Sequence, residues 1–520
     1  MSYYIGLDTS TTSTKALLMD ADGSVVGIGR SEYGYDTPRP LWTEQAPDLW
    51  WQATIEATTQ ALAESGVDGG DVSGIGMTGQ MHGLVLLDNT GEVLRPSILW
   101  NDQRTQAETD DIRDRVGRSR LIEVTGNDAM TGFTAPKILW VRNNEPEIYS
   151  RVAHVLLPKD YVRLRLTGEF ATDKAGASGT LLFDLAARDW SQEMLDALDI
   201  PLDWLPTTHE GPEITGALTE EAAQVMGLRR GTPVMAGGGD QAANGVGVGA
   251  VTSGVVAVSI GTSGVVFAAA DRPIFEPEGR LHAFCHAVPD TWHLMGVMLS
   301  AAGSYRWFRD TVAPYRDFSA LDEEAAAVPP GANGLVFLPY LTGERTPHSD
   351  PMARGAFVGL TVRHGLGHLA RAVMEGVAFG LRDSVELMAK EIELGEARAS
   401  GGGARSDVWV RIITDILDRP VRVVGTAESA AHGAAILAAT GDDAFASVAE
   451  ASQAAVTVGD VIEPTPDAAV YEDVYAIYRN LYPKLGGSFR NLGVIDAVSP
   501  RVSPSVGRSS AEGGEGASQG

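Results

Sequence analysis

The sequence predicts an α/β protein with two similar domains that face each other across an interdomain cleft. Its 520 residues, 44% of them hydrophobic and 21% charged, are typical of a globular chain long enough for two large domains. The N-terminal stretch "YYIGLDTSTTSTKALLMDADGSVVGIG" alternates apolar strands with polar turns. A similar pattern returns at Gly254–Asp271, where Gly261 aligns with Asp8 and Thr262 with Thr9. A duplicated fold places a cleft between its halves, and ligands favour such clefts.

Composition and charge exclude several classes of protein. The formal net charge of −28 repels nucleic-acid phosphates, so we expect no nucleic-acid partner. No apolar run approaches the roughly 18 residues that a membrane span needs, so we expect no membrane partner. The first residues do not resemble a secretory signal, and Cys285 is the only cysteine, so no intramolecular disulfide can form. These features favour the cytoplasm.

Along the chain we expect a first domain over residues 1–249 and a second over 250–490. The apolar spacing within residues 48–65 predicts a helix, and residues 72–77 and 84–87 are predicted strands. Residues 491–520 form the expected disordered tail, since the segment from Ser499 onward is dominated by Ser, Gly and Pro and has no aromatic residue.

The turn "DTSTTSTK" places a carboxylate, Asp8, at the end of a strand and follows it with hydroxyls. The backbone N–H groups and side chains of Thr9, Thr11, Thr12 and Lys15 can hold phosphate oxygens, and Asp8 can hold Mg²⁺. A polar β-turn is the alternative. No GxxxxGK[ST] sequence is present, so this is not a P-loop.

The echo of this turn lies at "GTSG", which contains Gly261 and Thr262. Two phosphate-binding turns that face a cleft are the arrangement of actin-type ATPases. The sequence therefore favours a nucleotide site between the two domains.

The stretch "GMTGQMHGLVLLD" places Gln80, Met81 and His82 between two predicted strands. A plain hairpin would use a short Gly, Asn or Asp turn, so these side chains suggest a ligand. A buried histidine in a hairpin is the alternative. Asn101 and Asp102 follow another apolar strand, where α/β proteins tend to bind ligands, and we expect them to contact substrate.

In "AGGGDQAANG" three glycines lead to Asp240, and they leave room for a ligand around its carboxylate. Such a carboxylate can take a proton from a hydroxyl, although a helix N-cap is an equally common use. In "SGGGARS" the residues Gly401, Gly402, Gly403 and Ser406 offer bare backbone against which an adenine ring could lie. A dinucleotide-binding loop is the rival reading, and a lone glycine-rich loop is weak evidence for either.

The loop "TGERTPH" contains Glu344, Arg345 and His348. For these charges taken singly we favour a surface loop held by an ion pair.

Together, the order of the motifs "GQMHG", "WND", "GGGD", "GTSG", "TGERTPH" and "GGGARS" resembles the FGGY family of carbohydrate kinases, over roughly residues 1–485. The resemblance implies two ribonuclease-H-like domains of the actin/hexokinase ATPase type. It implies ATP and Mg²⁺ as cofactors and transfer of the γ-phosphate to the 5-hydroxyl of D-xylulose. A homodimer is one assembly that it allows.

Carried over by position, the resemblance makes Asp240 the catalytic base and places Asp8 near Mg²⁺, so that both carboxylates are candidate metal contacts. Met81 and His82 match the substrate-binding pair, where glycerol kinases have a charged Arg–Glu pair. Thr262 matches the second phosphate turn, and Gly401–Gly403 matches the adenine loop.

Three rivals stay open. The first is a kinase of the same family for another ketose, such as ribulose. The second is an actin-like ATPase that forms filaments, which would not explain "GQMHG" or "GGGD". The third is a catalytically silent sugar sensor, against which an intact Asp240 argues.

Overall fold

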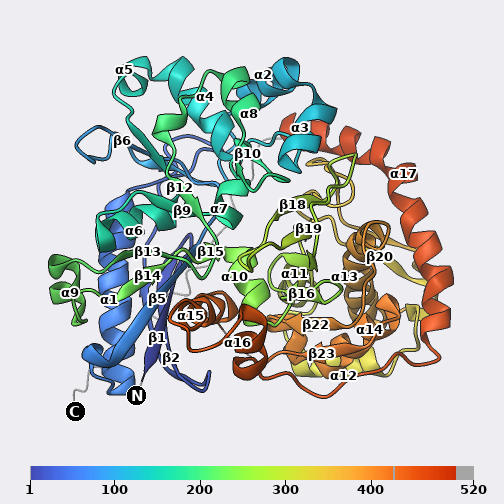
Figure 1. The fold of residues 1–520 in the computed structure, drawn as a ribbon. Coiled ribbons are helices and arrows are strands. Elements are labelled where there is room, and N and C mark those ends of the chain that lie inside the picture. Colours follow the sequence, from blue (N-terminus) through green and yellow to red (C-terminus); the bar gives the residue numbers. More distant parts are fainter. Residues whose placement is uncertain (1, 426–427, 499–520) are drawn as a thin grey trace, which may run out of the picture.

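The computed structural model describes residues 2–425 and 428–498. The ribbon divides into two lobes, with the N-terminal strands on one side and the sheet of the second half on the other (Figure 1). Within the described residues, no helix has both the length and the apolar character that crossing a bilayer requires.

A mixed sheet forms the centre of the first lobe. Its strand order is β13-β14-β5-β1-β2-β3, with β15 pairing β5. The strands are β1 (Tyr3–Thr9), β2 (Ser13–Asp20), β3 (Val25–Glu32), β5 (Val72–Gly79), β13 (Ile214–Ala217), β14 (Pro233–Met235) and β15 (Gly238–Gly239). Strand β1 is antiparallel to β2 and parallel to β5, so the ends of β1 and β5 lie side by side at Thr9 and Gly79.

The second lobe repeats this arrangement. Its sheet has the order β18-β19-β17-β16-β22-β23. The strands are β16 (Val256–Ile260), β17 (Gly264–Ala270), β18 (His282–Cys285), β19 (Trp292–Met298), β22 (Ala397–Ser400) and β23 (Val421–Val423). Here β16 is antiparallel to β17 and parallel to β22, as β1 is to β2 and β5. The predicted duplication is therefore visible in the pairing of both sheets.

Short strand pairs and helices surround the sheets. The pairs are β4 (Glu44–Gln45) with β7 (Ser97–Ile98), β6 (Val85–Leu87) with β8 (His154–Leu156), β9 (Ala171–Asp173) with β12 (Thr207–His209), β10 (Phe183–Asp184) with β11 (Asp189–Trp190), and β20 (Val336–Leu338) with β21 (Ala356–Val358). The predicted strand at 84–87 thus pairs with β8 and does not form a hairpin with β5.

The helices of the first half are α1 (Pro47–Ser65), α2 (Gln106–Val116), α3 (Arg118–Thr125), α4 (Thr134–Asn144), α5 (Pro146–Tyr149), α6 (Pro158–Thr167), α7 (Lys174–Ser178), α8 (Gln192–Leu198), α9 (Glu220–Met226) and α10 (Asp240–Gly247). Those of the second half are α11 (Ala302–Val312), α12 (Phe318–Ala326), α13 (Leu366–Met388), α14 (Asp407–Leu417), α15 (Ser429–Gly441), α16 (Val448–Ala455) and α17 (Ala468–Val498).

Helix α1 confirms the helix predicted for residues 48–65 and shows why it forms there. Pro47 occupies its first turn and Asp48 adds a favourable negative charge at the N-terminus. Gly66 ends the helix in the left-handed conformation with φ of 68°, and its N–H donates to the carbonyl of Leu62.

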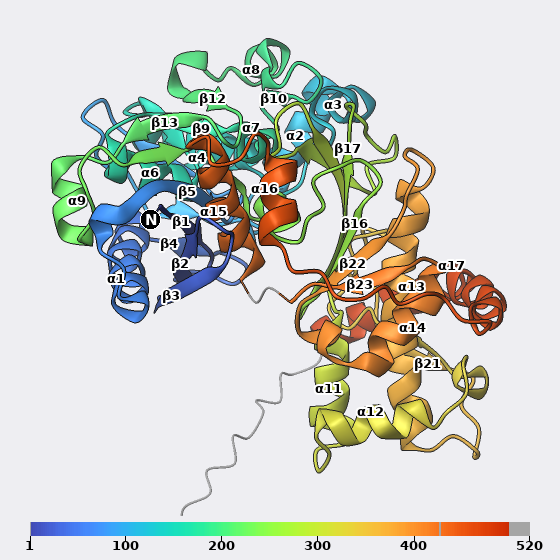
Figure 2. The same ribbon diagram turned by 60° about the horizontal axis from the view of Figure 1, so that its bottom comes forward.

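Helices α10 and α15 fill the space between the two sheets (Figures 1 and 2). Although α15 belongs to the second half of the chain, it packs on β1 and β5 of the first lobe. A Cβ atom on Gly6 would lie 1.8 Å from the carbonyl oxygen of Ala431, and one on Gly76 would lie 1.8 Å from that of Ala434. Only glycine allows the helix to approach the sheet this closely.

The C-terminal helix reaches beyond the domain boundary expected from composition. Helix α17 continues to Val498, whereas the sequence predicted a tail from residue 491. Phe489 is buried against the second lobe. The buried Phe489 thus anchors the helix just before the predicted boundary, while Leu492, Val494 and Ile495 beyond it are exposed. Residues 499–520, which the sequence predicts to be disordered, lie outside the described residues.

Candidate active site

A cavity of about 380 Å³ lies between the lobes and collects predicted site residues from both. From the first lobe it is lined by Gln80, Met81, His82, Trp100, Gln103, Met130, Thr131, Gly132, Phe133, Asp240 and Gln241. From the second lobe it is lined by Ser263, Val265, Met295, Val297 and Arg345. The sugar turn and the proposed base, 160 residues apart in the sequence, thus share one cavity.

Gln80 stands where β5 ends beside β1. Its backbone N–H donates to the carbonyl of Thr9 at 2.9 Å, which continues the strand pairing into the turn. Its side-chain Oε1 accepts a hydrogen bond from the Thr11 hydroxyl at 3.3 Å, and Trp100 donates to the same hydroxyl at 2.9 Å. The predicted phosphate turn and the predicted sugar turn are therefore joined through Thr11.

His82 has a left-handed backbone, with φ of 68°, which is uncommon outside glycine. Two donors hold its carbonyl in place: Lys137 Nζ at 2.8 Å and Thr134 Oγ1 at 3.1 Å. Its ring Nδ1 lies 2.6 Å from the carbonyl oxygen of Gly179. Because a carbonyl only accepts, Nδ1 carries the proton and Nε2 is left as an acceptor.

Burial lowers the pKa of His82 to about 3, although the bond to Gly179 opposes this shift. The ring is therefore neutral at physiological pH and offers one fixed lone pair. Met81 is buried beside it against Gly239, where an added Cβ would lie 2.8 Å from the thioether sulfur.

Asp240 is the first residue of α10 and follows the short strand β15. The backbone N–H of Gln241 donates to its Oδ1 at 2.9 Å. Burial raises the pKa of Asp240 to about 6, against the lowering effect of the contacts from Gln241. A carboxylate with this pKa is ionised at neutral pH and can still accept a proton from a hydroxyl.

Asp8 is buried at the end of β1, and its Oδ1 has no hydrogen-bond partner among the described residues. Burial raises its pKa to about 7, while Lys15 lowers it and the charges of Asp240 and Glu428 raise it further. The hydroxyl of Thr9 is also buried without a partner. Such unsatisfied oxygens fit a cation or a hydrated phosphate group that the protein binds from outside.

The remaining residues of the first turn are placed differently. Thr12 is exposed, and Lys15 forms an ion pair with Glu428 just ahead of α15. This pair links the turn to the second half of the chain.

The second turn, Gly261–Thr262, joins β16 to β17. The carbonyls of both residues accept hydrogen bonds from the start of the α11 segment, at 2.8 Å from Ala302 and 2.9 Å from Ala301. The Thr262 side chain is exposed and is therefore free to meet a ligand.

The glycine loop begins where β22 ends. Gly401 has φ of 86°, and a Cβ on Gly403 would lie 2.4 Å from Ile260 Cγ2. At Gly402 an added Cβ would meet no atom within 4 Å, so this part of the backbone is open. The Ser406 hydroxyl accepts from the Trp409 N–H at 3.2 Å and so caps α14.

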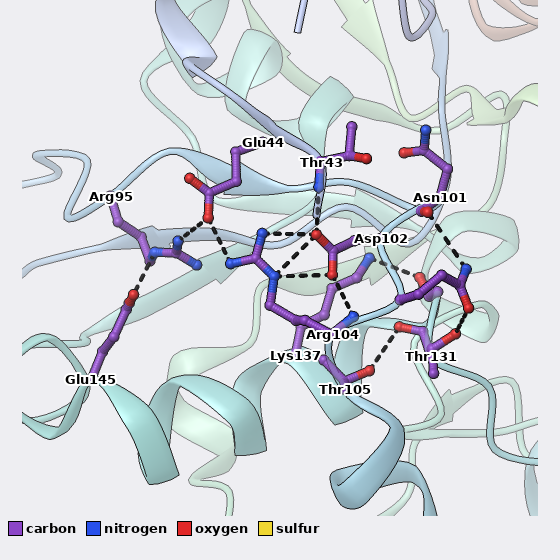
Figure 3. A network of polar contacts seen from close by, with 12 residues as sticks. Thr43, Glu44, Arg95, Asn101, Asp102, Arg104, Thr105, Thr131, Lys137 and Glu145 are labelled. Carbon is purple, nitrogen blue, oxygen red and sulfur yellow. Dashed lines mark hydrogen bonds and ion pairs between the residues drawn. The ribbon is translucent and has the colours of Figure 1, made fainter. Parts of the chain in front are cut away.

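Asn101 and Asp102, predicted to contact substrate, do not line the cavity. Figure 3 shows Asp102 turned toward Arg104 and the backbone of Thr43. Arg104 donates to both carboxylate oxygens at 2.7–3.0 Å, and the Thr43 N–H donates at 2.6 Å. The structure thus corrects the role of Asp102, because its oxygens are already occupied in a buried ion pair. Asn101 Oδ1 is buried without a partner among the described residues, so its role stays a prediction.

Arg345 is the residue that sequence reasoning missed most clearly. A surface ion pair was expected for the "TGERTPH" loop, but Glu344 is buried and accepts from the N–H groups of Leu299 and Arg345. The guanidinium of Arg345 belongs to the cavity wall. The signal in the sequence was the motif "TGERTPH" itself. It places a charged residue among Gly, Thr and Pro, and it is one of the motifs whose order resembles the FGGY family.

Comparison with known proteins identifies the family. The model of the N-terminal domain of FGGY family carbohydrate kinases matches residues 3–247, and that of the C-terminal domain matches residues 256–441. The xylulose kinase of Escherichia coli K12 is 47% identical over 79% of this chain and 84% of its own length. The xylulose kinase of Lactococcus lactis is 40% identical over 93% of this chain and 97% of its own length.

Among solved structures, the xylulose kinase of Rhodospirillum rubrum is 32% identical, with a TM-score of 0.87 over 94% of this chain and all of that one (100%). This agreement confirms the predicted fold of two α/β domains of the actin/hexokinase type. The two family models, the shared fold and the identity to these relatives lead to one conclusion: the chain belongs to the FGGY family of carbohydrate kinases.

Proposed function

We propose that this protein transfers the γ-phosphoryl group of ATP to the 5-hydroxyl of D-xylulose, with Asp240 as the general base. The observation that carries the proposal is the single cavity that joins the turn Gln80–His82 to Asp240. Two relatives of high identity are named xylulose kinases, which supports this substrate within the family.

The cavity has the chemistry that a polyhydroxy ketone requires. His82 Nε2 can accept a bond from a sugar hydroxyl, since Nδ1 is held by Gly179. Gln80 supplies an amide, and Met81 supplies an adaptable apolar surface for the carbon chain. Trp100 adds a flat wall at the edge of the cavity.

Phosphoryl transfer asks the protein mainly for position and charge stabilisation. Asp240 takes the proton of the 5-hydroxyl while that oxygen bonds to the γ-phosphorus, and the bond from this phosphorus to the bridging oxygen of ADP breaks. The raised pKa of Asp240 suits this task, because the proton must be accepted at neutral pH. The products are the sugar 5-phosphate and ADP.

The nucleotide would lie across both lobes. Thr9, Thr11 and Thr12 of the first turn and Gly261 and Thr262 of the second are proposed to face the phosphates. The adenine ring is proposed to lie on the open backbone of the glycine loop around Gly402.

The residues also fit Mg²⁺. The unsatisfied Oδ1 of Asp8 is the best candidate contact, and the charge of Asp240 lies close enough to raise the pKa of Asp8. The described residues contain no group of three or more ligating side chains, so phosphate oxygens and water would complete the coordination. When bound, the ion supplies positive charge that neutralises the phosphates. A cytoplasmic location and a homodimer stay predictions.

An ATP-coupled assay over D-xylulose, L-ribulose, D-fructose, L-fuculose and glycerol tests the function. D-Xylulose should give the highest kcat/KM. A higher value for ribulose or glycerol would contradict the substrate and leave the kinase activity standing. Pelleting in the presence of ATP, with no sugar phosphorylated, would instead favour a filament-forming ATPase.

A further inference from the structure

Arg345 stands on a loop that is fastened to the second lobe. The backbone N–H of its neighbour Thr346 donates to the carbonyl of Val297 at 3.0 Å, and the Val297 N–H donates back to Thr346 Oγ1 at 3.1 Å. Glu344, on the other side, is fixed through the N–H of Leu299 at 3.0 Å. The loop is thus held against β19 and the residue after it, and it places Arg345 in the wall of the cavity.

Nothing within the described part of the chain pairs with the Arg345 guanidinium by a hydrogen bond or an ion pair. The carboxylate next to it in the sequence, Glu344, has its pKa raised to about 8 by burial, and is thus largely neutral at pH 7. The Arg345 side chain is partly exposed and lines the cavity, so its five N–H donors are available to a ligand that enters there.

Arg345 and Asp240 line the same cavity from the second and the first lobe. Burial and the charge of Arg345 both lower the pKa values of His82 and His282, which places the guanidinium near these rings. No ion pair joins Arg345 to Asp240 among the described residues, although both line the cavity. A substrate whose reacting hydroxyl meets Asp240 can therefore present another of its oxygens to Arg345 within the same cavity.

The chemistry of a 2-ketopentose identifies that oxygen. Its furanose ring closes when the 5-hydroxyl adds to C2, so a sugar with a free 5-hydroxyl is in the open-chain form and has a carbonyl at C2. A carbonyl oxygen only accepts hydrogen bonds, and a guanidinium only donates them. A neutral His82, which offers an acceptor, cannot serve this oxygen, whereas Arg345 can.

We propose that Arg345 binds the C2 carbonyl oxygen of the open-chain ketose and so makes the enzyme select a ketose over the alditol of the same length. The inference rests on the proposed function. Reduction at C2 replaces the carbonyl with a hydroxyl, which can also accept but is a weaker match for a charged donor.

The test compares D-xylulose with xylitol and D-arabinitol, its two reduction products, in the wild type and in Arg345→Met. The methionine keeps an extended side chain and removes every donor. A hydrogen bond to a charged group typically contributes about 10- to 150-fold, so kcat/KM for D-xylulose should fall by about this factor. The kcat/KM values for the two alditols should change by less than about threefold. The ratio of kcat/KM for D-xylulose to kcat/KM for the alditols should therefore fall.

Arg345→Lys keeps the charge with fewer donors, so its kcat/KM for D-xylulose should lie between the values of the wild type and Arg345→Met. It replaces Arg345→Met in the test if the methionine variant does not fold. Arg230→Met is the matched control, since the Arg230 side chain is 73% exposed and, among the residues that the structure describes, pairs with Glu220 alone. Melting temperature and the KM for ATP report on the fold and the nucleotide site.

Equal losses of kcat/KM for the ketose and the alditols in Arg345→Met, or no loss for the ketose, would overturn the inference.

The assay of the wild-type enzyme over the panel of sugars tests the proposed function by itself. If another ketose is the best substrate, the same comparison is made with that ketose and its alditols. If no ketose is phosphorylated, both proposals fail.

Discussion

The ring Nδ1 of His82 lies 2.6 Å from the carbonyl oxygen of Gly179, and this contact fixes the tautomer of a ring that lines the cavity, with Nε2 as its acceptor. The backbone of His82 is held as well, because Lys137 and Thr134 both donate to its carbonyl. The imidazole is therefore positioned before any substrate arrives, which reduces the entropy cost of binding.

We expect His82→Ala to lower kcat/KM for D-xylulose by about 5- to 150-fold, since a sugar hydroxyl then loses its acceptor in the cavity. Basal ATP hydrolysis without sugar should change far less. His209→Ala, at a partly exposed histidine beside Glu213, is the control. Loss of ATP binding in His82→Ala would place the residue in the structural core and not in the sugar site.

Asp240→Asn keeps the shape of the side chain and removes the proton acceptor. General-base catalysis is typically worth about 10²- to 10⁴-fold, and kcat should fall by that order. Sugar binding measured by calorimetry should survive, because an amide still forms hydrogen bonds with the hydroxyl. Near-normal turnover would move the base to another residue.

The pKa of Asp240, raised by burial to about 6, sets the acid side of the pH profile. As pH falls through 6 the carboxylate gains a proton and can no longer act as a base, so kcat/KM should decline there. A free aspartate would decline only near 4. Burial keeps His82 neutral, with a pKa of about 3, so the histidine should add no loss near 6.5, whereas Asp8, whose pKa burial raises to about 7, is the other carboxylate that gains a proton in this range. Profiles from pH 5 to 8 check this, and Asp240→Asn should lack the part of the decline near 6.

Asp102 and Arg104 form an ion pair whose side chains are both 0% exposed. Removal of one partner from a buried pair typically costs about 3–5 kcal/mol when the other charge is left unpaired, but Arg104 keeps its second partner, Glu44, at 2.6 Å. We therefore expect Asp102→Asn to lower stability in urea unfolding by about 3 kcal/mol or less and to leave the KM for sugar nearly unchanged. Asp110→Asn, which removes an exposed partner of Arg113, should cost little. A raised KM at unchanged stability would return Asp102 to the sugar site.

Much of the fold could be predicted because its signals are local. Short apolar runs specify β1 and β5, which are buried along nearly their whole length, and Pro47 and Gly66 mark the ends of α1. The predicted sugar turn and Asp240 were found in the same way: glycines next to polar side chains at strand ends mark places where a ligand can approach the backbone.

The sequence by itself determined the two-domain α/β fold, the order of its motifs and the side chains with the chemistry for phosphoryl transfer. Only the tertiary structure decided which of those side chains meet. It brought Gln80, His82 and Asp240 to one cavity, paired Asp102 with Arg104, and placed Arg345 of a second-lobe loop in the wall of the same cavity. The physical reason is that a strand end or a glycine turn is specified by its neighbours in the chain. The partner of a carboxylate or a guanidinium depends instead on how distant elements pack, and no local pattern contains that information.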